Sequence, residues 1–148
     1  MIALLQRVAH ASVVVDDESI ARIGPGLLVL LGVQKPDGEA QAQRTVERIF
    51  GYRVFEDAEG KMNLSLQDTQ GELLLVPQFT LAADTRKGMR PSFSSAATPD
   101  EGRKWFGRVV ELSKMQSARV QTGCFGADMK VSLLNDGPVT FWLETGQV

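Results

Sequence analysis

Residues 27–33 read Leu-Leu-Val-Leu-Leu-Gly-Val, an apolar run in which apolar and polar side chains do not alternate. Strands that expose one face to water show such alternation, so this run predicts a strand covered on both faces. A second apolar run, Leu73-Leu74-Leu75-Val76, leads into Pro77-Gln78-Phe79-Thr80-Leu81. We therefore predict a second buried strand over residues 71–81.

Each of the two predicted strands is followed by a predicted helix. Asp37 is a suitable N-cap for the first helix. Thr98 suits the same position in the second, with Pro99 as its first residue and Glu101 closing a capping box. Apolar side chains at helical spacing give each helix one face to bury. These side chains belong to Ala42, Val46, Ile49 and Phe50 in the first helix and to Trp105, Phe106, Val109 and Leu112 in the second.

The rest of the chain is typical of strands and turns. Stretches with strand composition lie at residues 3–8, 12–15, 20–23, 118–121, 129–134 and 139–144. Asn135-Asp136-Gly137-Pro138 predicts a turn between the last two strands. Strands around two well-separated helices predict an α/β fold with a mixed sheet and helices on one side of it. This many strands could also fold the sheet on itself into two layers. We predict one domain over residues 1–148.

The composition is that of a globular protein, with 43% hydrophobic and 23% charged residues. The formal net charge of −2 argues against nucleic-acid binding over the whole surface, but it permits a local basic patch. Gln6-Arg7 follows the first apolar residues too soon for a signal peptide, and no apolar run is long enough to span a bilayer. We therefore expect a cytoplasmic protein without a membrane segment.

Metal ligands and catalytic nucleophiles are scarce. His10 is the only histidine and Cys124 the only cysteine, so one chain cannot assemble a usual zinc site or an intrachain disulfide. The same count removes most Ser-His and Cys-His pairs. We interpret His10 as a partly buried or surface histidine of a strand, and Cys124 as a buried structural thiol. We expect neither a metal nor a cofactor.

Two polar features at strand ends are possible sites. Gln78 and Thr80 lie at the C-terminal end of the second buried strand, where α/β sheets often place their sites. A strand end decorated with polar side chains would show the same pattern. The sequence pattern around Gly137-Pro138, taken alone, favours a plain turn.

Two sets of cations are possible contacts for phosphate groups. A loop after residue 84 carries three cations, and such a loop is either solvated surface or a contact for nucleic-acid backbone. Its cations are Arg86, Lys87 and Arg90. A second set on the polar face of the second helix could extend that surface, and it consists of Arg103, Lys104 and Arg108.

Four motifs in the same order resemble those of the D-aminoacyl-tRNA deacylase family, in its bacterial and eukaryotic type. They cover essentially the whole chain, and each is moderately specific by itself, while the four in order are strongly specific. The motifs are Gln6-Arg7-Val8 with Ala11-Ser12-Val13, Gln78-Phe79-Thr80-Leu81-Ala82-Ala83-Asp84, Gly123-Cys124-Phe125-Gly126-Ala127, and Asn135-Asp136-Gly137-Pro138-Val139-Thr140.

The resemblance implies a three-layer α/β/β fold with a mixed, partly barrel-like sheet and two main helices. It also implies a homodimer with a site at each subunit interface. The implied enzyme is a carboxylic ester hydrolase that cuts the ester between a D-amino acid, or mischarged glycine, and the 3′ adenosine of tRNA. Its partners are D-aminoacyl-tRNA and Gly-tRNA, its role is translation quality control, and it rejects L-aminoacyl-tRNA.

The family's catalytic motif falls on Gln78, Phe79 and Thr80. An aminoacyl ester is already activated, so positioning and backbone N–H donors could suffice for its hydrolysis. We expect Phe79 to donate its backbone N–H and Gln78 to hold the terminal adenosine or the α-amine. We expect Thr80 to position the carbonyl rather than attack it, because one chain offers no base to activate its hydroxyl.

The remaining roles follow from the resemblance too. Gly137 and Pro138 would form a cis pair, inserted from the partner subunit, whose carbonyls leave no room for the Cβ of an L-residue. The tRNA contacts would involve Arg86, Lys87 and Arg90.

One residue departs from the family's pattern, which usually has serine where this chain has Pro77. Proline has neither an N–H nor a hydroxyl, so any role of that serine is absent or moved. Two alternatives stay open: an editing domain of the same fold that removes an L-amino acid, and a non-catalytic tRNA-binding or dimerisation module. The Gly137-Pro138 pair argues against the first, and Pro77 is the feature that favours the second.

Overall fold

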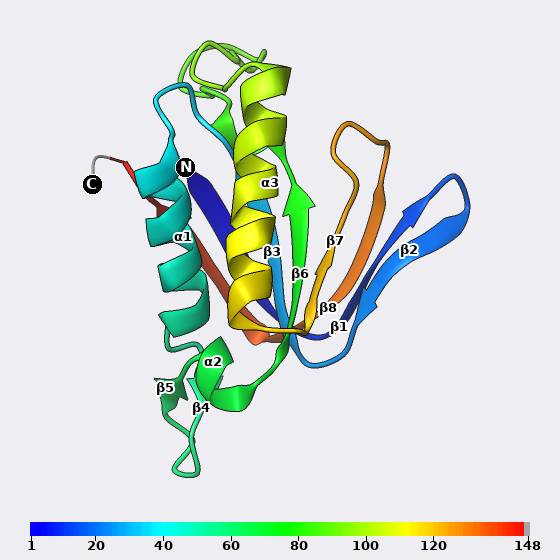
Figure 1. The fold of residues 1–148 in the computed structure, drawn as a ribbon, viewed down its shortest axis with the longest axis vertical. Helices are drawn as coiled ribbons and strands as arrows, with labels where there is room; N and C mark the ends of the chain where they lie inside the picture. The colour runs from blue at the N-terminus through cyan, green and yellow to red at the C-terminus, as the bar shows by residue number, and fades with distance from the viewer. Residues whose placement is uncertain (147–148) are drawn as a thin grey trace.

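In the computed structural model, which describes residues 1–146, the two apolar runs form adjacent parallel strands, β3 (Gly26–Gly32) and β6 (Glu72–Pro77) (Figure 1). Leu27 and Val29 of β3 point into one hydrophobic cluster, whereas Leu28 points into another on the opposite face. Fully burying one such side chain contributes about 1.5–3 kcal/mol, so these two strands anchor both clusters. The prediction of strands covered on both faces is confirmed.

The other elements follow in chain order around these two strands. The strands are β1 (Ile2–Val15), β2 (Glu18–Ile23), β4 (Phe55–Glu56), β5 (Met62–Leu64), β7 (Val120–Thr122) and β8 (Lys130–Glu144). The helices are α1 (Glu39–Gly51), α2 (Leu66–Thr69), α3 (Pro99–Gln116) and the 3-10 helix η1 (Phe79–Ala82). The long helices α1 and α3 are the two that the sequence predicted.

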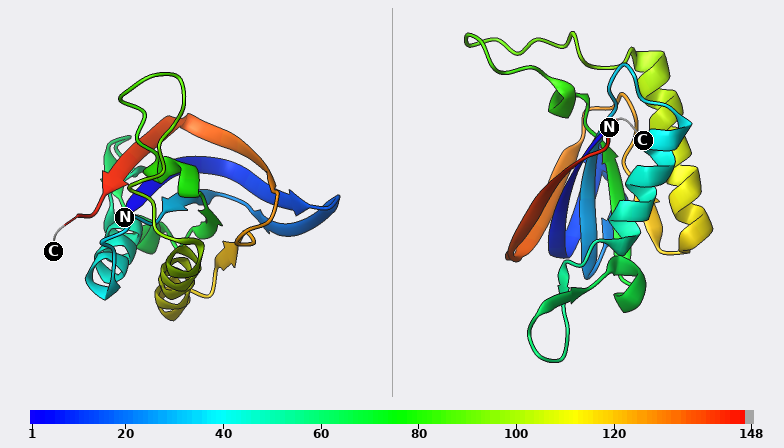
Figure 2. Two further views of the ribbon diagram at one scale, coloured as in Figure 1. Left: turned by 90° about the horizontal axis from the view of Figure 1, so that it is seen from above. Right: turned by 90° about the vertical axis from the view of Figure 1, so that its left-hand side faces the viewer.

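The two hydrophobic clusters separate three layers. One cluster lies between the central strands and α1 with α3, and the other lies between the central strands and an outer layer of β2, the first half of β8 and the second half of β1 (Figure 2). The main sheet has the order β2-β1-β3-β6-β7, with β8 paired to β1. The backbone N–H of Arg22 in β2 donates to Gln121 Oε1 in β7, at 2.8 Å, so the two ends of this order meet. The predicted three-layer α/β/β fold with a partly barrel-like sheet is confirmed.

Strand β1 is shared between the layers. Its first half pairs with β3 and its second half with β2, while β8 pairs antiparallel with almost its whole length. The two predicted strands at 3–8 and 12–15 are therefore one strand. The predicted strands at 129–134 and 139–144 are also one, and the predicted turn between them is wrong because both parts run in the same direction along β1.

The residues of that predicted turn form a bulge in β8 instead. Gln6 pairs with Thr140 and Val8 pairs with Asn135. The two pairs are therefore two residues apart along β1 but five residues apart along β8. The three extra residues loop out of the sheet, as in an enlarged β-bulge. We call residues 135–140 the β8 bulge.

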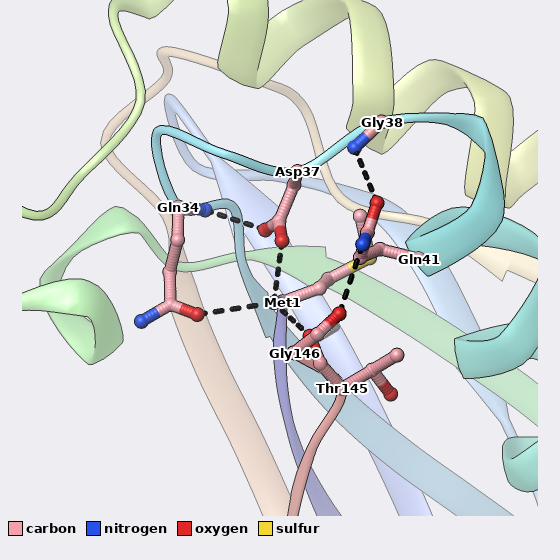
Figure 3. Close-up of polar contacts among 7 residues, drawn as sticks. All are labelled: Met1, Gln34, Asp37, Gly38, Gln41, Thr145 and Gly146. Atoms are coloured by element: carbon pink, nitrogen blue, oxygen red, sulfur yellow. Dashed lines mark hydrogen bonds and ion pairs between the residues drawn. The ribbon is translucent and has the colours of Figure 1, made fainter. Parts of the chain in front are cut away.

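The start of α1 differs from its prediction. The N-cap residue is Gly38, whose N–H donates to Gln41 Oε1 at 2.8 Å. The carboxylate of Asp37 instead accepts from the α-ammonium group of Met1 at 2.8 Å and from the N–H of Gln34 at 2.7 Å (Figure 3). The α-ammonium group also donates to the carbonyl of Thr145 at 2.7 Å, so Asp37 neutralises a buried charge rather than capping the helix.

The start of α3 is confirmed except in one detail. Thr98 Oγ1 accepts from the N–H of Glu101 at 3.3 Å, and Pro99 is the first helical residue. The Glu101 carboxylate does not close the capping box, because it accepts from Trp105 Nε1 at 3.0 Å. No helix within residues 1–146 has the length and apolar character needed to cross a membrane.

Candidate functional site

The end of β6 turns sharply into η1. Gln78 N–H donates to the carbonyl of Leu31 at 2.8 Å, and Leu81 N–H then donates back to the carbonyl of Gln78 at 3.2 Å. Gly32 permits this close turn, since a Cβ there would lie 3.0 Å from the Cβ of Leu81 and 3.1 Å from the carbonyl oxygen of Gln78. The strand predicted over residues 71–81 therefore ends at Pro77.

The first residues of η1 present donors rather than ionisable groups. The N–H groups of Phe79 and Thr80 open the helix, so neither has an acceptor within it. The side chain of Thr80 is exposed, and its hydroxyl accepts a hydrogen bond from the amide of Gln78. Such paired backbone donors can bind an anionic or strongly polarised oxygen atom.

A cavity of about 600 Å³ opens beside these donors. Pro77, Gln78 and Phe79 line one side of it, and the first turns of α3 line another through Gly102 and Phe106. The side chain of Phe79 is 61% exposed and packs against Phe93, with ring centroids 5.3 Å apart. The cavity has the size and the mainly apolar lining of a small-molecule site.

Sequence reasoning missed several residues of this cavity. Phe93 and the motif residues Phe125, Gly126 and Ala127 line it together with Met129. Phe125 was part of a motif to which we assigned no role. Its aromatic side chain between two glycines was the available signal, but only the fold shows that the loop after β7 reaches the end of β6.

The β8 bulge is held by buried polar contacts. The guanidinium group of Arg7 donates to the carbonyls of Val54 at 2.8 Å and Asp136 at 3.2 Å. The amide of Asn135 donates to the carbonyls of Arg7 at 2.9 Å and Val139 at 3.1 Å. Arg7 is only 8% exposed, so these contacts anchor the bulge to a buried side chain. The sequence signal for this role was a lone arginine within an apolar strand.

Gly137 and Pro138 lie at the exposed tip of this bulge, and the peptide bond between them is cis. Gly137 has a φ of +120°, in the region that favours glycine. A Cβ on Gly137 would lie 2.9 Å from Arg7 Nη2 and 2.8 Å from Val139 Cγ2. The tip therefore has both a backbone conformation and a packing that only glycine fits.

The structure does not bring the two predicted parts of the site together within one chain. The bulge lies at the level of Val8, which pairs with Gly26 and through it with Glu72, the first residue of β6. Gln78 follows the last residue of that strand. Six residue steps separate Glu72 from Gln78, about 20 Å at about 3.3 Å per step.

The loop with the three predicted cations extends away from the body of the molecule (Figure 2). Arg86 makes a bidentate ion pair with Asp84, with hydrogen bonds of 2.9 and 2.7 Å. These bonds lower the pKa of Asp84 to about 2 and raise that of Arg86. Lys87 and Arg90 are exposed, and among residues 1–146 neither forms an ion pair.

The second cationic set does not form one surface. Arg108 donates three hydrogen bonds to the carboxylate of Glu39, which lower the pKa of Glu39 and raise that of Arg108. Lys104 lies over the ring of Trp105, and Arg103 lies over the ring of Phe125. Arg103 thereby contacts a residue of the cavity.

The two remaining sequence interpretations have different outcomes. His10 is a surface residue of β1, as predicted. The prediction that Cys124 is buried is wrong, because the thiol is exposed and the neighbouring Phe125 turns inward to pack against Phe106. Within the described part of the chain, no group of three or more His, Cys, Asp or Glu residues could hold a metal ion.

Several known proteins are similar to this chain. The family model for D-Tyr-tRNA(Tyr) deacylase matches residues 4–144. The D-aminoacyl-tRNA deacylase of Thioalkalivibrio sulfidiphilus (strain HL-EbGR7) is 66% identical over 144 residues, or 97% of each chain. That of Salmonella agona (strain SL483) is 60% identical over 97% of this chain and 99% of its own.

Two solved structures have the same fold. The c-Myc DNA Unwinding Element Binding Protein is 39% identical, with a TM-score of 0.95 over 99% of both chains. A probable eukaryotic D-amino acid tRNA deacylase is 18% identical, with a TM-score of 0.83 over 96% of this chain and 97% of its own, and at that identity it supports the fold alone. The family model and the 60–66% identical relatives show that this chain belongs to the D-Tyr-tRNA(Tyr) deacylase family.

Proposed function

We propose that this protein hydrolyses the ester between a D-amino acid, or glycine, and the 3′ adenosine of tRNA, and that it leaves L-aminoacyl-tRNA intact. The observation that carries the proposal is the cavity that Phe79 lines at the start of η1, where the N–H groups of Phe79 and Thr80 have no acceptor within the helix. Its apolar lining suits a nucleoside, and the two donors suit an ester oxygen that gains negative charge. We place the activity in the cytoplasm, where aminoacyl-tRNA is used.

The proposed mechanism relies on position rather than on a catalytic base. The carbonyl oxygen of the ester accepts from the N–H of Phe79, and water adds to the carbonyl carbon. The ribose 2′-hydroxyl passes the proton of that water to the 3′-oxygen as the C–O bond breaks. Gln78 holds the adenosine or the α-amine, and its bond to Thr80 keeps the threonine hydroxyl in a positioning role.

We propose further that two copies of the chain form a homodimer in which the β8 bulge of one subunit reaches the cavity of the other. Two observations support this arrangement. The bulge and the cavity lie at different levels of one chain, and the strand β8 exposes Leu134 and Trp142, each 53% exposed, on either side of the bulge. A two-fold axis would pack this face of β8 against the same face of the partner subunit. Each bulge would then reach the cavity of the other subunit.

In this dimer the carbonyls of Gly137 and Pro138 face the α-carbon of the bound aminoacyl group. They leave room for hydrogen but not for the Cβ of an L-residue, so the filter excludes by shape and does not test the side chain. Glycine passes the same filter. The contacts of Arg7 and Asn135 support this role, since a steric filter works only if its atoms are held in place.

We assign tRNA contact to the exposed loop with Arg86, Lys87 and Arg90. Lys87 and Arg90 are the two that can neutralise phosphates directly, whereas Arg86 fixes the loop through Asp84. Pro77 ends β6 beyond the last pairing of that strand with β7, Leu75 with Thr122. Its missing N–H therefore breaks no strand pairing with β7.

The decisive experiment incubates the purified protein with D-Tyr-tRNA and L-Tyr-tRNA in parallel, with a chelator present, and follows the release of tyrosine. Loss of the D-ester alone supports both the activity and its handedness. Loss of both esters refutes the steric filter and indicates a general esterase. Stability of both esters refutes the enzyme and leaves the binding module.

A further inference from the structure

A cation lies at the rim of the cavity. The guanidinium group of Arg103, in the second turn of α3, lies over the ring of Phe125 with its Cζ 4.8 Å from the ring centroid. Phe125 and Gly126 both line the cavity. A Cβ built on Gly126 would lie 3.7 Å from Arg103 Nη2, so the charged group reaches the edge of the lining.

This cation is not neutralised by the protein. Arg103 is exposed, and among residues 1–146 it forms no ion pair. Arg86 and Arg108 differ in this respect, because carboxylates bind both of them. Stacking on an aromatic ring orients the guanidinium plane without using its N–H groups. Arg103 therefore presents oriented donors that can bind an anion in a bidentate manner.

We propose that Arg103 binds the phosphate on the 5′ side of the terminal adenosine of the substrate, an inference that rests on the proposed function. With the ester at Phe79 and the nucleoside in the cavity, this phosphate is the nearest charge on the substrate's backbone. A phosphate inside an apolar lining would lose its hydration without compensation, so it lies at the rim. The rim is where Arg103 holds its donors, and this makes Arg103 a binding residue for the end of the tRNA.

Binding measurements test this contact without turnover. Isothermal calorimetry compares adenosine with adenosine 5′-monophosphate, which differ by the phosphate. The wild-type protein is expected to bind the monophosphate about tenfold more tightly, the gain of one charge-assisted contact. In Arg103→Ala this preference disappears, while the affinity for adenosine stays within about twofold, a difference of about 0.4 kcal/mol. Arg103→Lys keeps an intermediate preference, because it retains the charge but not the stacked planar group.

The control is Lys114→Ala, which removes an exposed cation from the last turn of the same helix. It is expected to keep the full preference for the monophosphate. A wild-type protein without this preference, or an Arg103→Ala variant that retains it, overturns the assignment. The outcome is separable from that of the proposed function: stable D-Tyr-tRNA refutes the hydrolase, whereas the phosphate preference alone decides the role of Arg103.

Discussion

The end of β6 and the β8 bulge carry the two parts of the predicted site, and they are built in opposite ways. Around Gln78 and Phe79 the side chains are partly exposed, polar contacts are few and a cavity is open. At the bulge, the buried guanidinium of Arg7 and the amide of Asn135 hold the backbone. A binding surface can remain open until a ligand fills it, whereas an element that works by its shape must be rigid beforehand. Substitutions at the bulge should therefore change stability, and substitutions at the cavity should change activity alone.

The largest effect is expected for Arg7→Ala. The change leaves the carbonyls of Val54 and Asp136 without their buried donor, so the free energy of unfolding should fall by about 3 kcal/mol. Urea denaturation measures this loss. The exposed Arg22, in β2, provides the control, and Arg22→Ala should change the free energy by less than about 0.5 kcal/mol. Equal values for the two variants would mean that Arg7 does not hold the bulge.

The next effect is expected for Gly137→Ala. Its positive φ and the close approach of Arg7 Nη2 should together lower the free energy of unfolding by about 2 kcal/mol. The ratio of D-Tyr-tRNA to L-Tyr-tRNA hydrolysis should also fall as the tip shifts. Gly60→Ala is the matched control, because Gly60 has a φ of +77° with open space around it. A Gly137→Ala variant no less stable than Gly60→Ala would show that contact with Arg7 does not matter.

A smaller and different effect is expected for Gln78→Ala. Among residues 1–146 the side chain bonds only to the exposed Thr80 hydroxyl, so the melting temperature should not change. The value of kcat/KM for D-Tyr-tRNA should fall about tenfold, as expected for one lost substrate contact. Gln43→Ala, on the surface of α1, should leave both quantities unchanged. A drop in melting temperature for Gln78→Ala would break the contrast between an open cavity and a rigid bulge.

The smallest effect is expected for Arg86→Ala, in the exposed loop that carries the three cations. The hydrogen bonds from Arg86 lower the pKa of Asp84 from 3.8 to about 2. Because the folded pKa is the lower one, this pair supports the loop above pH 4, and its contribution is lost as the pH falls from 4 toward 2. In Arg86→Ala the pKa of Asp84 should return toward 3.8. Titration of the carboxyl carbon by NMR measures the shift, and an unchanged pKa would mean that the ion pair is absent in solution.

The parts of the fold that the sequence predicted are those in which local pattern and burial agree. The run at 27–33 and the Thr98-Pro99 helix start each contain their own signal, and both are confirmed. The errors lie where contacts with a segment distant in the sequence determine the local structure. Asp37 has the chemistry of an N-cap, but the α-ammonium group of Met1 binds it. Asn135-Asp136-Gly137-Pro138 has the composition of a turn, but β1 pairs with the chain on both sides of it.

The site shows the same division. The motif at Gln78, Phe79 and Thr80 was predicted from the sequence, and the structure places Gln78 and Phe79 in the lining of a cavity. The supporting role of Arg7 and the inward turn of Phe125 could not be predicted, because both depend on contacts with segments remote in the chain. Sequence alone also could not show that the cavity and the Gly137-Pro138 tip lie at different levels of the sheet.

The shared strand β1 also bears on how the protein is made. Ile2 pairs with Glu144, so β1 leaves the ribosome long before β8, its main partner. Until then β1 has an unpaired edge beside apolar side chains, which is the kind of edge that recruits other chains. Long-range pairing of this sort slows folding and exposes the nascent chain to aggregation. Stop codons or stalling before residue 130 should therefore give insoluble fragments rather than smaller folded domains, and chaperones that bind nascent chains should matter more to this protein than its modest length suggests.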